Sequence, residues 1–274
     1  MPEADTLTLT KHHGAGNDFL VLVDPEGGTP LGADQARALC DRHLGVGADG
    51  LLTLGPPADG AALSMVLRNA DGGLAEMSGN GLRCLAQAAV LAGLAAPPRF
   101  TVATAAGVRT VTYTPSEAPW LADAAVDMGP VTLGPDVGVP FEGALRARRA
   151  DVGNPHLVVQ VPDARAVAVA VLGPELEAAW PGGMNVEFVS TDGAGGLDLA
   201  VWERGAGVTL ACGTGTCASA EVARAWGLAG DRVAVANPGG RLEVTLGAAP
   251  GDPVTLAGPV RKVAEVTVDR HMLS

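Results

Sequence analysis

The chain has 274 residues, a formal net charge of −12 and 47% hydrophobic residues. That composition is typical of a globular protein and too apolar for a disordered one, while the acidic balance argues against a nucleic-acid or anionic-membrane partner. Met1 to Asp5 lacks the basic and apolar segments of an export signal, and the longest apolar stretch, around Ala88 to Ala96, is too short to span a bilayer. The sequence therefore predicts a cytoplasmic protein.

Hydrophobic periodicity predicts a mixed sequence of short strands and helices. In chain order the first part shows strands, a helix, a strand, a second helix and a hairpin over Leu7–Thr10, Phe19–Val23, Asp34–Arg42, Ala62–Leu67, Leu82–Gly93 and Phe100–Thr114. From about Ala122 the pattern begins again, with two strands, a helix and two further strands over Leu157–Val161, Leu197–Val201, Thr214–Trp226, Leu242–Leu246 and Val260–Val268.

Three short patterns recur in the same order along the chain. Gly16-Asn17 is echoed by Gly153-Asn154, and the turn Ser78-Gly79-Asn80-Gly81 is echoed by Cys212-Gly213-Thr214-Gly215, each directly before a helix. Asn69 precedes Ser78 by the same nine residues as Glu203 precedes Cys212. The recurrence predicts two similar halves that each contribute half of a site. The alternative is chance, because glycine-rich turns are frequent in a chain with 38 glycines.

The turn that begins at Cys212 is the strongest chemical signal. A cysteine at a helix N-terminus faces backbone N–H groups and the positive end of the helix dipole, which favours the thiolate. The same N–H groups can bind a carboxylate. The turn lacks the Gly-Lys-Ser/Thr of a phosphate loop, and Cys212 and Cys217 lack the spacing of a metal site. A lone turn of this kind is more often structural, but its counterpart at Ser78 favours a catalytic role.

Further polar groups stand where strands or turns are predicted to end. Arg204 can hold a carboxylate and Glu203 can receive an ammonium, although a surface ion pair is an equal alternative. His156 shares a tight turn with Asn154. The asparagines as a set suit a ligand with several charged ends, unless they serve only the turns; they are Asn17, Asn69, Asn80, Asn154 and Asn185.

Seven stretches in a fixed order resemble the diaminopimelate epimerase family over nearly the whole chain. They are Lys11–Phe19, Arg42–Gly50, Asn69–Gly72 with Gly79–Cys84, Gly153–His156, Asn185–Phe188, Glu203–Gly207 and Ala211–Gly215. The resemblance implies an α/β (α+β) fold of two pseudo-symmetric domains, each a β-sheet wrapped around a central helix, with the site in the cleft between them. The expected domains are residues 1–121 plus 265–274, with the Ser78 turn, and residues 122–264, with the Cys212 turn.

The family reaction is the interconversion of LL- and meso-diaminopimelate, a step toward lysine and peptidoglycan, without a cofactor or metal. Inversion by proton transfer needs a base on one face of the α-carbon and an acid on the other. The resemblance gives these roles to positions 78 and 212, with His156 and Glu203 tuning them. Substrate binding is implied for Asn17, Asn69, Gly79, Asn80, Asn154, Asn185, Glu203, Arg204, Gly213 and Thr214. A small-molecule substrate is thus the expected partner, and a homodimer is among the assemblies that the sequence leaves open.

Ser78 departs from the family pattern, which has cysteine there. A serine hydroxyl is a far weaker acid than a thiol and needs a neighbouring base, such as His156, to act. Cys84 is a poor substitute because it lies inside the predicted helix. Ser78 therefore leaves three alternatives: a slow or retuned amino-acid racemase or epimerase, an engineered substitution that stalls an active enzyme, or a catalytically inactive amino-acid-binding homologue. A second departure, Gly50 in place of the glutamine of some members, puts a distal substrate contact in doubt.

Overall fold

The computed structural model describes residues 6–273. The chain forms two compact units, Met1–Val126 with Pro259–Ser274, and Asp127–Gly258. Two strands belong partly to each unit, β8 (Leu121–Pro130) and β17 (Pro253–Asp269). The boundaries expected from the sequence, after residue 121 and before residue 265, lie within these two strands.

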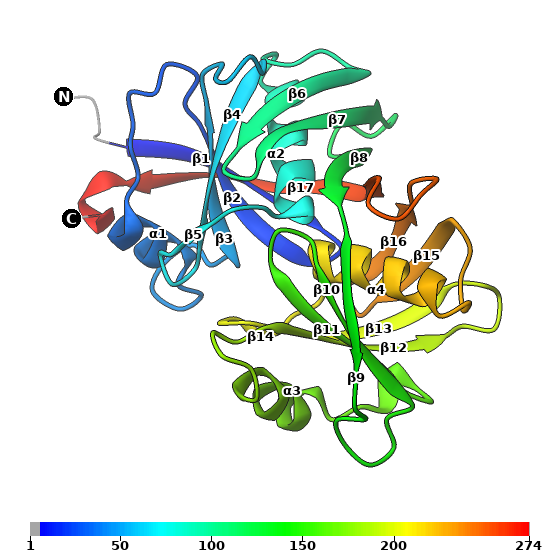
Figure 1. The fold of residues 1–274 in the computed structure, drawn as a ribbon. Coiled ribbons are helices and arrows are strands. Elements are labelled where there is room, and N and C mark those ends of the chain that lie inside the picture. Colours follow the sequence, from blue (N-terminus) through cyan, green and yellow to red (C-terminus); the bar gives the residue numbers. More distant parts are fainter. Residues whose placement is uncertain (1–5, 274) are drawn as a thin grey trace, which may run out of the picture. The chain divides into compact units, whose positions relative to one another are not determined.

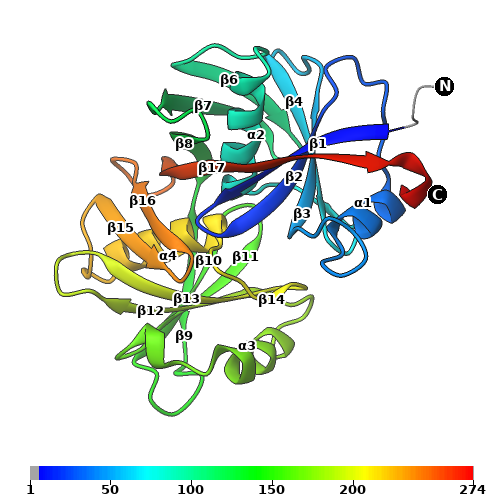
Figure 2. The same ribbon diagram turned by 180° about the vertical axis from the view of Figure 1, so that it is seen from behind.

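The first unit is a strongly curved sheet with two α-helices. Its strands are β1 (Thr6–Gly14), β2 (Asn17–Val23), β3 (Gly50–Gly55), β4 (Leu63–Asn69), β5 (Leu74–Ala75), β6 (Arg99–Thr104), β7 (Gly107–Pro115), most of β8 and the end of β17. Its helices are α1 (Ala33–Cys40), α2 (Gly79–Leu91) and the 3-10 turn η2 (Arg270–Leu273). The pairs β2–β3 and β4–β6 are parallel and the pairs around them antiparallel, with β1 between β2 and β17 (Figure 2).

The second unit repeats this topology. Its strands are β9 (Thr132–Val137), β10 (Arg146–Asp151), β11 (Pro155–Gln160), β12 (Asn185–Thr191), β13 (Leu197–Glu203), β14 (Gly207–Val208), β15 (Arg232–Asn237), β16 (Gly240–Thr245) and the start of β17. Its helices are η1 (Ala164–Ala166), α3 (Val169–Ala178) and α4 (Gly213–Ala225). The parallel pairs are β11–β12 and β13–β15, so β10–β17 follow the same order as β1–β8.

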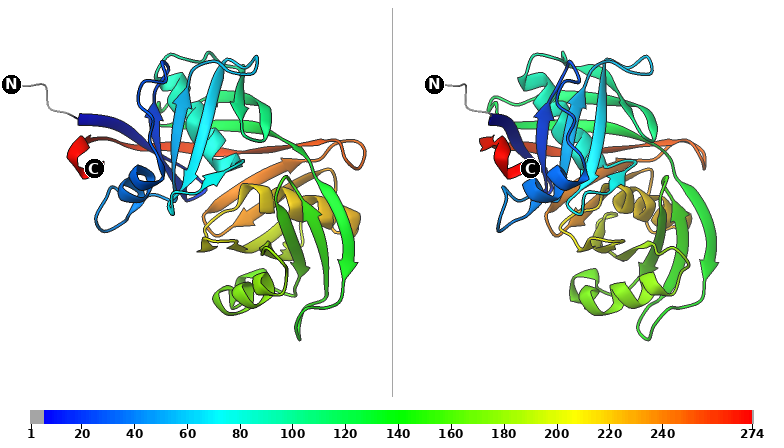
Figure 3. Two further views of the ribbon diagram at one scale, coloured as in Figure 1. Left: turned by 60° about the vertical axis from the view of Figure 1, so that its left-hand side comes forward. Right: turned by 90° about the vertical axis from the view of Figure 1, so that its left-hand side faces the viewer.

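Each unit encloses one helix. Residues Gly79–Ala89 of α2 are all buried, against β1, β2, β3, β4 and β7 (Figure 1). Residues Gly213–Ala223 of α4 are buried in the same way against β10–β13, β15 and β16 (Figure 3). Both helices are rich in small side chains, which let strands approach closely on several sides. The expected fold, a sheet wrapped around a central helix in each of two similar units, is confirmed.

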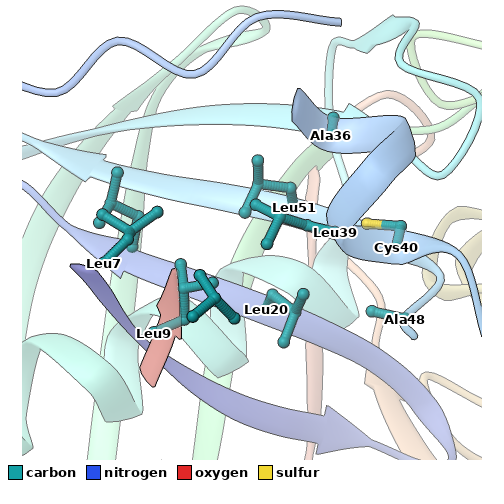
Figure 4. Close-up of a cluster of buried hydrophobic side chains, with 10 residues drawn as sticks. Leu7, Leu9, Leu20, Ala36, Leu39, Cys40, Ala48 and Leu51 are labelled. Carbon is teal, nitrogen blue, oxygen red and sulfur yellow. The ribbon is translucent and has the colours of Figure 1, made fainter. Parts of the chain in front are cut away.

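A second helix covers the outer face of each sheet. In the first unit α1 packs on β3 and β4, and its Leu39 joins an apolar cluster with Leu9, Leu20 and Leu51 (Figure 4). In the second unit α3 packs on β12, β13 and β14. The sequence pattern did not predict α3, because Pro174 interrupts its helical signal. Among residues 6–273, no helix is long and apolar enough to cross a membrane.

Candidate active site

Ser78 and Cys212 occupy the same structural position in their units. Each is the N-cap of the enclosed helix, with backbone angles of φ −142°, ψ 117° at Ser78 and φ −112°, ψ 117° at Cys212. Gly81 N–H donates to Ser78 Oγ over 3.0 Å, and Gly215 N–H donates to Cys212 Sγ over 3.3 Å. Each turn therefore holds its reactive atom at the N-terminus of a buried helix, where the N–H groups of the first turn have no acceptor within the helix.

Cys212 lies among groups that can exchange its proton. The carboxylate of Glu203, at the end of β13, lies close enough to act on the thiol, because its charge raises the pKa of Cys212. The hydroxyl of Thr209 donates to the Oε1 atom of the same carboxylate, and the hydroxyl of Thr214 lies 3.5 Å from Cys212 Sγ. Thr209 was not predicted from the sequence, because only the hairpin from β13 through β14 brings it back to Glu203.

The pKa of Cys212 is raised well above its ordinary value, first by burial and then by the charges of Glu203 and Glu187. The Gly215 hydrogen bond lowers that pKa, but by less. The sequence predicted a thiolate at the helix N-terminus, and this prediction is corrected. The cap favours the thiolate, but burial beside two carboxylates favours the thiol more strongly. Burial also raises the pKa of Glu203. Burial thus opposes the ionisation of both groups, and it favours the thiol form of Cys212.

His156 joins this cluster from β11. Its Nδ1 atom lies 2.8 Å from Glu187 Oε1 on β12, and its Nε2 atom lies 2.9 Å from Asn154 Oδ1. Asn154 Nδ2 in turn lies 3.4 Å from the hydroxyl of Thr214. Sequence reasoning found His156 and Asn154 but missed Glu187. The signals for it were a carboxylate within a mostly apolar strand and its place in the stretch Asn185–Phe188 that resembles the family.

The Ser78 turn has a different set of neighbours. Asn80 donates to Asn17 Oδ1 over 3.2 Å, and Asn17 donates to Asp49 over 2.7 Å. The fully buried guanidinium of Arg83 donates to Asn80 Oδ1 over 2.6 Å. These amides fasten the turn to β2 and to the loop before β3. Any substrate contact they make would use their remaining hydrogens and lone pairs.

The strand register shows how unlike the two half-sites are. The parallel pair β2–β3 aligns Phe19 with Gly50 and Val21 with Leu52. The corresponding pair β11–β12 aligns His156 with Asn185 and Val158 with Glu187. Phe19 and Leu52 thus stand where the second unit has His156 and Glu187. Likewise Asn69, opposite Gly50, stands where the second unit has Glu203.

The remaining predicted residues are also placed. Asn185 donates to the Pro155 carbonyl and accepts from Arg204 N–H, so it ties the ends of β11, β12 and β13 together. The Arg204 guanidinium is exposed and donates to the Gly182 carbonyl. The Asn69 side chain is exposed. Cys84 is buried within α2, and burial raises the pKa of its thiol to about 12.

Within the described part of the chain, no three His, Cys, Asp or Glu side chains are grouped so as to hold a metal ion. The groups that remain for chemistry are a thiol with a carboxylate partner at one helix cap and a hydroxyl at the other. Two like-folded units that each present a proton-carrying side chain at the cap of an enclosed helix define an isomerase of the racemase and epimerase class.

Similar proteins of known family belong to the same class of isomerase. The family model for diaminopimelate epimerase matches residues 9–134 and 149–263, and the chain belongs to the diaminopimelate epimerase family. The chain is 39% identical over 280 residues to a diaminopimelate epimerase of Cyanothece sp., covering 94% of this chain and 98% of that one. It is 41% identical over 278 residues to a diaminopimelate epimerase of Thermobifida fusca, covering 94% and 97%.

Solved structures share the fold at low sequence identity. A probable proline racemase from Agrobacterium radiobacter K84 aligns with a TM-score of 0.76 at 20% identity, covering 96% of this chain and 92% of that one. A predicted epimerase from Pseudomonas aeruginosa aligns with a TM-score of 0.73 at 18% identity, covering 96% and 99%. These likenesses support the two-unit α+β architecture.

Proposed function

We propose that the protein is a cofactor-independent epimerase that interconverts LL- and meso-diaminopimelate by proton transfer at the α-carbon. The observation that carries the proposal is the cluster at the α4 cap, where the charge of Glu203 acts on the Cys212 thiol and the Thr209 hydroxyl donates to the same carboxylate. The family relatives in Cyanothece sp. and Thermobifida fusca bear the name diaminopimelate epimerase. Lysine biosynthesis in the cytoplasm is part of this proposal.

In the proposed reaction Glu203 takes the thiol proton of Cys212, and the resulting thiolate removes the α-proton from one face of the substrate. The electron pair left on the α-carbon is delocalised into the α-carboxylate. We assign that carboxylate to the first-turn N–H groups of Gly79, Asn80, Gly213 and Thr214, which stabilise negative charge as it develops. A proton delivered to the opposite face completes the inversion, and we assign its delivery to Ser78 Oγ.

Other substrate contacts follow the same assignment. We propose that Asn17, Asn69, Asn154, Asn185 and Arg204 bind the polar ends of the small-molecule substrate, and that His156 tunes the Cys212 cluster. None of these roles needs a cofactor or a metal. A homodimer of this chain is part of the same proposal.

The serine favours a second candidate function. Among described residues of the first unit, the positions equivalent to His156, Glu187 and Glu203 hold Phe19, Leu52 and Asn69, none of which can take a proton from Ser78 at neutral pH. An alcohol without such a base is a weak acid–base catalyst. A slow or retuned amino-acid racemase, or an amino-acid-binding homologue without turnover, is therefore the alternative to full diaminopimelate epimerase activity.

Solvent deuterium incorporation separates these functions. The proposal predicts that deuterium enters the α-position of one diaminopimelate isomer faster than that isomer is inverted, because Cys212 exchanges its proton more readily than Ser78. Each isomer is incubated with enzyme in D2O and followed by NMR and by chiral separation. Binding of both isomers by calorimetry without exchange into either would establish the binding homologue instead.

Two substitutions complete the test. Ser78→Cys supplies the second thiol and is expected to raise epimerase turnover by about 10²-fold or more, the usual contribution of a positioned acid–base group. Cys212→Ala is expected to abolish exchange into both isomers. An unchanged turnover in Ser78→Cys would indicate a site retuned for another amino acid. Full activity in Cys212→Ala would refute the proton-transfer role given to this residue.

A further inference from the structure

We propose that Glu187 is a positioning residue for the reaction: it holds a proton on His156 Nδ1 and thereby fixes the hydrogen-bond chain that ends at Cys212. This inference rests on the proposed function for its kinetic consequence, but the hydrogen-bond chain can be tested without turnover. Glu187 was not among the residues that the sequence indicated. It lies in the middle of β12 with no exposed surface.

The chain of contacts is continuous within the second unit. Glu187 Oε1 lies 2.8 Å from His156 Nδ1, and both side chains are fully buried. Asn154 Nδ2 donates to the Thr214 hydroxyl over 3.4 Å, which turns Asn154 Oδ1 toward His156 Nε2 at 2.9 Å. That hydroxyl lies 3.5 Å from Cys212 Sγ. Each ring nitrogen of His156 therefore faces an oxygen atom, Glu187 Oε1 on one side and Asn154 Oδ1 on the other.

The first unit shows that the fold does not need this pair. At the equivalent register positions, β2 and β3 place Phe19 and Leu52, and both are buried. A buried pair of ionisable groups is costly to desolvate and is often replaced by apolar residues without loss of stability. Moreover, Glu187 Oε2 is buried without a hydrogen-bond partner among the described residues. A carboxylate kept at such a position points to a role in chemistry.

Glu187 also lies directly beneath the reactive turn. A Cβ atom at Gly215 would stand 2.5 Å from Glu187 Oε1, so the first turn of α4 rests on this carboxylate. The equivalent Gly81 instead faces Leu52 Cδ2, at 3.4 Å. The negative charge of Glu187 is one of the causes that raise the pKa of Cys212. Glu187 thus acts on the thiol both through the His156 chain and through its charge.

The sharpest test places the apolar pair of the first unit at the equivalent positions of the second unit. The double variant His156→Phe with Glu187→Leu copies the Phe19–Leu52 pair, so it is expected to fold, and its thermal melting confirms this. We expect kcat for deuterium exchange through Cys212 to fall by about 10²-fold, with little change in KM. Asp198→Asn is the matched control, because Asp198 is another buried carboxylate of the same unit and pairs with Arg165 outside the site. It is expected to leave kcat unchanged.

A double-mutant cycle separates positioning from simple packing. If Glu187 acts through His156 as well as through its charge, Glu187→Gln lowers kcat more in the wild-type background than in His156→Phe, where only the loss of the charge remains. Equal effects of Glu187→Gln in both backgrounds, or wild-type kcat in the variant that carries both apolar residues, would overturn the inference.

Nitrogen-15 NMR of the histidine rings provides a readout that needs no substrate. The wild-type protein is expected to show a protected Nδ1–H signal that disappears in His156→Phe, which assigns it, and is lost in Glu187→Leu. An unprotonated Nδ1 in wild type would refute the role of Glu187 even in an active enzyme. If the wild type neither exchanges nor inverts diaminopimelate but shows this signal, the proposed function fails and the positioning chain stands.

Discussion

The charge of the Glu203 carboxylate raises the pKa of the Cys212 thiol, and burial raises the pKa values of both groups. The thiol can become a nucleophilic base only when Glu203 is ionised and takes its proton. The state of Glu203 therefore controls whether the Cys212 half-site works. Because burial raises the pKa of this glutamate, the rate should fall on acidification at a higher pH than an exposed glutamate would give.

Thr209 is expected to set where that fall occurs. Its hydroxyl donates to Glu203 Oε1, and this hydrogen bond lowers the pKa of Glu203 against the effect of burial. Thr209→Val removes the donor while keeping the shape. We expect the acid limb of kcat/KM for deuterium exchange to move to higher pH by about one unit, since hydrogen bonds to charged groups contribute about 1.5–3 kcal/mol.

Thr209→Ser is the matched control, because it keeps the hydroxyl and should keep the wild-type pH profile. The measurement is the pH dependence of exchange for wild type and both variants between about pH 5 and pH 9. A Thr209→Val profile that coincides with wild type would show that the hydrogen bond does not tune Glu203.

The first unit contains a buried histidine that makes stability depend on pH. His12 is fully buried, with Nδ1 2.8 Å from Gln87 Oε1 and Nε2 3.0 Å from Thr10 Oγ1. Burial lowers its pKa from 6.5 to about 4. The unfolded chain then binds this proton more tightly than the folded protein does. The contribution of neutral His12 to the free energy of unfolding is complete above pH 6.5 and is lost as the pH falls from there toward 4.

We expect His12 to lower the free energy of unfolding by about 2 kcal/mol between pH 7.5 and pH 5. The measurement is urea unfolding of wild type and of His12→Gln at both pH values. The difference in the free energy of unfolding between wild type and His12→Gln should be smaller at pH 5 than at pH 7.5 by that same amount. A constant difference would mean that His12 titrates alike in both states.

The parts of the fold and site that the sequence predicted are those with local causes. The helices after Ser78 and Cys212 could be predicted because the N-cap side chain and the glycine that donates to it lie only three residues apart in the sequence. The duplication was visible because equal spacings, such as that from Glu203 to Cys212, survive in the sequence. The two helix ends were marked by Gly93 and Gly227, which adopt positive φ values of 72° and 73°.

What could not be predicted depends on strand register and burial. Glu187 lies on the same sheet face as His156 only because β11 and β12 pair in parallel with Val158 opposite Glu187. Thr209 meets Glu203 only through the β13–β14 hairpin. The protonation of Cys212 was misjudged because the helix N-terminus is local, whereas the burial and the carboxylates that outweigh it come from distant strands.

The first turn of α4 packs on Glu187, so Gly215 has no room for a side chain. An alanine Cβ there would lie 2.5 Å from Glu187 Oε1 and 3.1 Å from its Cγ and Cδ atoms. Glu187 is fully buried and bonded to His156, so it has little room to move aside. We expect Gly215→Ala to lower the free energy of unfolding by about 1–3 kcal/mol, as overpacking does, and to reduce exchange through Cys212 by shifting the cap.

Gly230→Ala is the control for the effect of alanine itself. Gly230 follows α4 in the same unit, and a Cβ atom there would meet nothing within 4 Å, so its effect on the free energy of unfolding should stay within about 0.5 kcal/mol. Both variants are compared with wild type by urea unfolding and by deuterium exchange. If Gly215→Ala is as stable and as active as Gly230→Ala, Glu187 does not support the turn that holds Cys212, because an unyielding carboxylate at that distance cannot accommodate a methyl group.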